Sequence, residues 1–249
     1  MGGDRHHATQ GRGRDLIALA AAEFPKEFDV AAGVNWPMIA AALVSRMVGT
    51  LESILDQQPK GREADPGSDV RRLLEHAVIL AWLAADPSTE RIEAWQKSDL
   101  RARLAADADA RAHGQPLFTD EQRIGMEAQV ARLRGDRISV ENAALEADGF
   151  WAGKLPGMGG KGELKSWRGF YAIVYRNYSG YTHPTMRGLN PVVVDLSPTR
   201  RRVQLEGRHE GNGPYGIATV IFGLALFVVA ETLGWPNVDE VTAIFDRYP

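Results

Sequence analysis

The feature that most constrains the fold is an apolar run of about 16 residues from Tyr215 to Ala230, which is followed by Glu231. A helix needs about 20 apolar residues to cross the core of a bilayer. No cluster of Lys or Arg flanks the run closely. The run is therefore predicted to be a buried helix at the centre of a helical domain rather than a membrane span.

Most of the remaining chain has the three- and four-residue spacing of amphipathic helices. The spacing is clearest from Trp36 to Gln57, where Asn35 is a candidate N-cap and Pro37 suits the first turn. Further helices are predicted at 70–85, 88–111, 119–134, 163–182 and 238–248, with a short apolar segment at 15–24. The expected fold class is mainly α, an irregular helical bundle of about seven to eight helices.

Three segments depart from this pattern. Residues 1–14 are polar, Gly-rich and basic and lack the apolar stretch of a signal peptide, so we expect a flexible tail ahead of a single helical domain at 15–249. Residues 192–194 and 202–205 predict a small β-hairpin insertion across the turn at 197–198. Gly149 to Gly162 lacks the Gly-Lys-Ser/Thr of a phosphate-binding P-loop and is predicted to be a loop over the core.

The residue types exclude several kinds of chemistry. The chain has no cysteine, which removes thiolate catalysis, thiolate metal sites and disulfides and fits a cytoplasmic protein. None of the histidines at 76, 113 and 183 has Glu three residues before it, and no His-Glu-x-x-His is present. No Gly-x-Ser-x-Gly elbow marks a serine hydrolase. We therefore expect no metal and no cofactor.

The charge is unevenly distributed. The chain has a net charge of −3. Between Lys161 and Arg208 there are nine Lys or Arg against three Asp or Glu, a local net charge of +6 that leaves −9 elsewhere. Such a block is either a solvated basic face or a face that binds anions.

One segment, Tyr175 to Pro184, combines several reactive side chains on the helix predicted at 163–182. At helical spacing Arg176, Ser179 and His183 lie near one another on a face away from the core. Pro184 places His183 at the helix end, where the helix dipole favours a protonated imidazole. The core stripe of the same helix is expected to hold Leu164, Trp167, Phe170, Tyr171, Val174, Tyr178 and Tyr181. A purely structural interpretation also accounts for the segment, with Arg176 paired to an acidic residue and His183 in a helix-ending turn.

A second group of polar residues, Arg71, Arg72, Glu75 and His76, lies on the helix predicted at 70–85. Charges at the edge of a buried helix need partners. We expect Glu75 to pair with Arg72 three residues before it or with Arg176 of the other helix. In the functional interpretation Glu75 supports Arg176 or His183 in a shared cleft.

The order Arg176-Asn177 followed by five residues and His183 resembles the motif of the HEPN superfamily, in which Arg and a polar residue are followed by four to five residues and His. The superfamily consists of compact helical domains that include metal-independent ribonucleases. A wider pattern also resembles an uncharacterised bacterial family over roughly Trp36 to Leu233. It consists of Arg71-Arg72-x-x-Glu75, a loop with Leu and Pro, and a Tyr-Arg-x-x-Ser-x-x-x-His-Pro signature.

The HEPN resemblance implies that Arg176 and His183 of two protomers meet across a homodimer interface and that the 2′-hydroxyl of RNA attacks the neighbouring phosphate. His183 would then be the general acid or base, Arg176 would stabilise the phosphorane and Asn177 would orient phosphate or imidazole. Glu75, Arg72, Ser179 and Tyr175 would support them. The implied function is an RNA-cleaving or RNA-binding protein with a toxin or phage-defence role.

The alternative is a non-catalytic helical interaction or small-ligand-binding module with a protein or small-molecule partner. In that interpretation Glu75, Arg176 and His183 line a polar cleft. Neither hypothesis involves a membrane.

Overall fold

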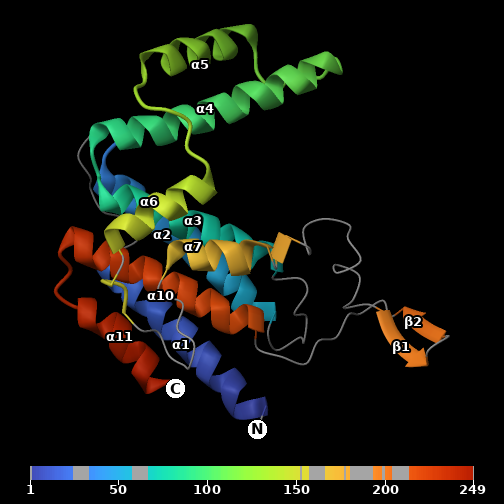
Figure 1. The fold of residues 1–249 in the computed structure, drawn as a ribbon, viewed down its shortest axis with the longest axis vertical. Coiled ribbons are helices and arrows are strands. Elements are labelled where there is room, and N and C mark those ends of the chain that lie inside the picture. The colour runs from blue at the N-terminus through green and yellow to red at the C-terminus, as the bar shows by residue number, and fades with distance from the viewer. Residues whose placement is uncertain are drawn as a thin grey trace.

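The apolar run forms α10 (Gly213–Leu233), which is buried along most of its length and packs against four other helices, α1, α2, α3 and α11 (Figure 1). The computed structural model describes residues 2–24, 34–57, 67–151, 153–156, 166–176, 178–179, 193–197, 200–203 and 213–248. The predicted buried helix and the mainly α-helical class are confirmed within this part of the chain.

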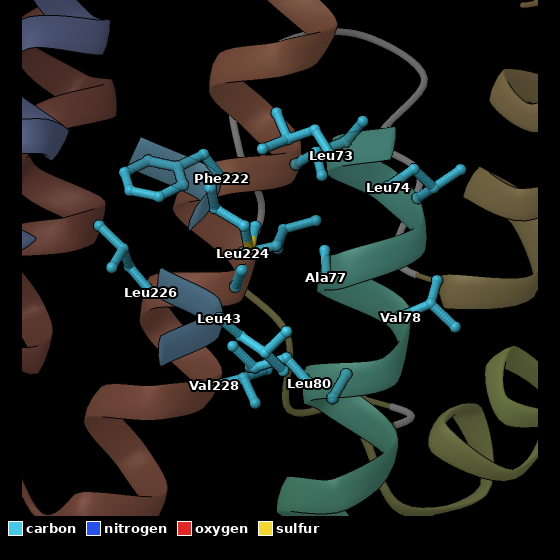
Figure 2. Packing of buried hydrophobic residues seen from close by; sticks show 14 of the residues in the cluster. Leu43, Leu73, Leu74, Ala77, Val78, Leu80, Phe222, Leu224, Leu226 and Val228 are labelled. Carbon is cyan, nitrogen blue, oxygen red and sulfur yellow. The ribbon is translucent and has the colours of Figure 1, made fainter. Parts of the chain in front are cut away.

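Helices α2 (Trp36–Gln57) and α3 (Gly67–Ala85) pack against α10 and against each other. Figure 2 shows Leu43 of α2, Leu73 and Leu80 of α3 and Phe222 of α10 in the shared core. Asn35 caps α2 as predicted, since its Oδ1 accepts from the Met38 amide at 3.1 Å. By length and composition α2 and α10 both match a membrane-spanning helix, and the core helices of soluble proteins meet the same criterion.

The sequence did not predict α6 (Val140–Trp151), which extends into the expected loop at 149–162. Its inner face is Ala143, Ala144 and Ala147, and such small side chains give a weak apolar pattern. Two indole groups fix α6 to α3 in opposite directions. Trp151 Nε1 donates to the Ala81 carbonyl at 2.9 Å, and Trp82 Nε1 donates to Glu146 Oε2 at 2.7 Å.

Helices α4 (Thr89–Ala112) and α5 (Asp120–Arg132) pack on each other as an arm beside the core (Figure 1). Asp107 is fully buried and organises the turn between these two helices. Its Oδ1 accepts from the amides of Leu117 and Phe118 at 2.8 and 3.0 Å, and its Oδ2 accepts from Arg111 Nε at 2.6 Å. The hydrogen bond from Arg111 lowers the pKa of Asp107, so the carboxylate stays charged inside the turn.

Several short elements complete the described chain. Helix α7 (Trp167–Phe170) continues into a π-helical turn, η2 (Tyr171–Tyr175), and α11 (Val238–Arg247) follows α10. Strands β1 (Val193–Ser197) and β2 (Arg200–Val203) pair antiparallel, with residue 193 opposite 203 and residue 195 opposite 201.

The N-terminus differs from the expected tail at 1–14, because α1 spans Gly2–Glu23. Two glycines allow this helix to approach its neighbours closely. A Cβ at Gly11 would lie 2.5 Å from Tyr248 Cε1, and one at Gly13 would lie 2.6 Å from Leu55 Cδ1. Arg12 donates to the Tyr248 carbonyl and its guanidinium lies over the Phe245 ring. The same glycine content that indicates a loose segment in the sequence therefore serves close helix packing.

We predict opposite effects of alanine at two helical glycines. A Cβ at Gly49 of α2 would meet open space, so Gly49→Ala should raise the free energy of unfolding by about 0.5 to 1 kcal/mol through helix propensity. Gly11→Ala has the same propensity gain but must displace Tyr248, and overpacking costs about 1 to 3 kcal/mol. Urea unfolding of both variants checks this, and equal stability of the two would contradict close packing at Gly11.

Candidate active site

The structure describes part of the motif predicted from the sequence. Arg176 follows η2 directly and its side chain is exposed. Asn177 and His183 lie outside the described residues. Ser179 lies on the same helical turn, and its Oγ donates to the Tyr175 carbonyl at 2.6 Å. The predicted core stripe is confirmed for the residues that are buried here, which are Trp167, Phe170, Val174 and Tyr178.

The start of this segment is fixed by Asp148 at the end of α6. The Asp148 carboxylate accepts from the amides of Trp167 and Arg168 at 2.5 and 3.1 Å and from Ser166 Oγ at 2.6 Å. Ser166 Oγ in turn accepts from the Gly169 amide at 3.0 Å. These bonds satisfy the N–H groups at the start of α7. They also attach the start of α7, which continues into η2, to the end of α6.

Tyr175 is held by its contacts with Tyr171 and α3. The rings of Tyr171 and Tyr175 stack with centroids 4.5 Å apart and an interplanar angle of 22°. The Arg71 guanidinium lies over the Tyr175 ring, 4.2 Å from its centroid, and donates to the Tyr175 hydroxyl at 2.6 Å. Burial, then the neighbouring Tyr175 and Glu141, raise the pKa of Tyr171, so the Tyr171 phenol is neutral near pH 7.

The prediction that Glu75 pairs with Arg72 or with Arg176 is wrong. Glu75 Oε1 accepts from Arg71 Nε at 3.1 Å, whereas Arg72 lies 3.4 Å from Asp69. The pairing follows helix geometry, because residues four apart lie on the same side of a helix with Arg71 and Glu75 both toward η2. Arg71 belongs to the polar group predicted on this helix but is not among the predicted site residues. Its four-residue spacing from Glu75 was the signal that could have identified it.

Arg176 has no acidic partner within the described ranges. No carboxylate of these residues forms an ion pair or hydrogen bond with its guanidinium. The structural interpretation, in which Arg176 pairs with an acidic residue, therefore receives no support from this part of the chain. Glu75 is engaged by Arg71 instead, and its second oxygen, Oε2, accepts no bond from a described residue.

His76 of α3 experiences the positive charges of two arginines, one on α2 and one on α3. Its Nδ1 is buried and has no hydrogen-bond partner among the residues that the structure describes. Burial lowers the pKa of His76, and the charges of Arg46 on α2 and Arg72 on α3 lower it further. His76 is therefore neutral at pH 7.

No group of three or more His, Asp or Glu side chains in the described segments is arranged to bind a metal ion. The contact between α3 and η2 brings together the Arg71 guanidinium, the Glu75 carboxylate and the phenols of Tyr171 and Tyr175. The exposed Arg176 follows η2 directly in the chain.

Comparison with known proteins places these elements in a family. A family model matches residues 38–199, which is more than half of the chain. The chain belongs to DUF5677, a family of unknown function. The DUF5677 segment contains α3, η2 and Arg176 and ends before α10. No curated protein and no solved structure matches the chain.

Substitutions at two adjacent arginines of α3 should differ in their effect on stability. Arg71 is 22% exposed and holds both Glu75 and Tyr175, so Arg71→Ala should lower the free energy of unfolding by about 1 to 3 kcal/mol. Arg72 is 57% exposed and pairs with Asp69, so Arg72→Ala should cost about 0 to 1 kcal/mol. Urea unfolding measures both. Similar losses in the two variants would mean that the contact between Arg71 and Tyr175 does not hold η2.

The lowered pKa of His76 predicts a pH dependence of stability. The unfolded chain protonates this imidazole near pH 6.5, while the folded protein resists protonation to a lower pH. Stability is therefore lost as the pH falls below about 6.5 and through the folded-state pKa. His76→Gln removes this contribution and leaves the other histidines in place. Between pH 8 and pH 5 the wild type should lose more unfolding free energy than the variant, and parallel curves would contradict the prediction.

Proposed function

We propose that this protein is a metal-independent RNA-cleaving or RNA-binding protein of the HEPN-like type. The observation that carries the proposal is the exposed Arg176, which no described carboxylate neutralises, at the end of a turn that Arg71 and Glu75 hold in place. An exposed guanidinium that follows a positioned turn, and that no described carboxylate neutralises, is suited to bind a phosphate and to stabilise the charge that develops on it.

The residues have distinct roles in this proposal. Arg176 contacts the scissile phosphate, His183 transfers the proton of the attacking 2′-hydroxyl or of the leaving group, and Asn177 orients phosphate or imidazole. Arg71 is a positioning residue, because it acts through Tyr175 on the helical turn that precedes Arg176. The proposal includes a homodimer in which the Arg176 to His183 faces of two copies meet, a cytoplasmic location and a role in a toxin or phage-defence system.

A second candidate function is a non-catalytic interaction or small-ligand-binding module whose polar cleft includes Glu75, Arg176 and His183. One observation favours it. Glu75 is 33% exposed, and its Oε2 has no partner among the described residues. A carboxylate oxygen in this state is able to accept a hydrogen bond from a ligand or a partner protein.

RNA cleavage in EDTA tests the proposal. Purified wild type should cleave a mixed RNA pool, and both Arg176→Ala and His183→Ala should cleave at least about 100-fold more slowly, since each removes a group that acts in the transition state. Arg101→Ala is the matched control, because Arg101 is also an exposed helical arginine but lies on the α4 arm.

The control should cleave like wild type, and all four proteins should have similar melting temperatures. Wild type that neither cleaves nor binds RNA would contradict the proposal and favour the interaction module. Cleavage that both site variants retain would place the activity elsewhere or in a contaminant.

A further inference from the structure

A second surface, with positive charge that is only partly compensated, lies on the side of α3 that faces α2. Arg46 of α2 and Arg72 of α3 are both exposed, and both act electrostatically on His76. We call these three residues the α2/α3 edge. Arg46 forms no ion pair with a described residue, and Asp69 is the one described carboxylate paired with Arg72.

The residues four positions after Arg71 and after Arg72 explain why this edge keeps a net positive charge. Arg71 has a carboxylate, Glu75, four residues later and forms an ion pair with it. Arg72 has His76 at the equivalent position, and burial keeps that imidazole uncharged. A Glu at position 76 would stand four residues after Arg72, the same spacing as Arg71 and Glu75, and would add a negative charge where Arg46 and Arg72 both act. The neutral histidine adds no negative charge, so of the described carboxylates only Asp69 pairs at this edge, and an excess positive charge remains to attract an external anion.

The edge and the proposed active site both include residues from the first turns of α3. The first turns of α3 carry Arg71, which contacts Tyr175 next to Arg176, and the following residue on the helix is Arg72. Helix α3 packs against η2 on one side and against α2 on the other. Exposed arginines therefore occur on three elements of which α3 packs against the other two. They are Arg176 directly after η2, Arg72 on α3 and Arg46 on α2.

We propose that the phosphate backbone of a single-stranded RNA runs from Arg176 across the α2/α3 edge, where Arg72 and Arg46 each contact a phosphate. This inference rests on the proposed RNA function and deepens it by naming the path of the strand. Contacts of this kind carry no sequence information and strengthen binding in a salt-dependent way.

Salt-dependent binding tests the path. The probe is a fluorescent 20-nucleotide RNA with 2′-O-methyl groups, which lacks the attacking hydroxyl and stays intact with wild-type protein. Each phosphate contact with single-stranded nucleic acid contributes about 0.7 to the slope of log affinity against log salt. Arg46→Gln and Arg72→Gln should each lower the slope by about 0.7, and the double variant by about 1.4.

Three further variants make the result specific. Arg101→Gln should leave the slope unchanged, and Arg46→Lys should keep it because it retains the charge. His76→Glu should weaken RNA binding without removing either arginine, because the new carboxylate adds a negative charge where both act. Circular dichroism melts show whether each variant is folded.

The outcomes separate the two proposals. If Arg176→Gln lowers the slope but Arg46→Gln, Arg72→Gln and His76→Glu do not, RNA binds at Arg176 and the path over the α2/α3 edge is wrong. If wild type does not bind the probe, the RNA function and the path both fail.

Discussion

Helix α10 has no polar side, and this constraint arranges the rest of the molecule. A helix that is apolar all round must be covered on every side, and α1, α2, α3 and α11 provide that cover. Helix α3 packs its apolar side chains against α10, α2 and α6, so its rotation about its own axis is fixed by the core (Figure 2). The polar residues in its first turns are then held at the surface between η2 and α2. The position of the candidate site is thus a consequence of core packing.

The spacing of residues on α3 divides its polar side into two parts with different electrostatics. Arg71 and Glu75 compensate each other toward η2, where they hold Tyr175. Arg72 and His76 face α2, and there the positive charge is only partly compensated, by Asp69. A single helix therefore uses one ion pair to position a neighbouring turn and leaves another arginine with excess charge at the surface. Four-residue spacing is enough to produce both effects.

The sequence predicted the features that depend on strong periodicity and local capping. The helix at 36–57, its Asn35 cap and the buried run at 215–230 were all found, because apolar spacing and side-chain caps are local signals. The sequence missed α6, whose inner face is made of alanines, and the helical structure of residues 2–14, whose glycines allow close packing. The partner of Glu75 was also missed, because the choice between Arg71 and Arg72 depends on where η2 lies. Tertiary contacts of this kind are not encoded in periodicity.

The limits of the DUF5677 segment bear on how the site is built. Residues 38–199 include α3, η2 and Arg176, but α10, which buries α3 together with α2 and α6, lies outside them. The segment that carries the polar groups thus depends for its core on α10, which follows β2 in the chain. An exposed arginine costs little free energy without a partner, so stability alone does not require Arg46, Arg72 or Arg176 to be neutralised. What sets them apart from ordinary solvated arginines is their placement on three elements that the core holds in adjacent positions. Because α3 packs against both η2 and α2, the core holds the backbone at these three arginines in a set arrangement, and the proposed RNA path relies on that arrangement.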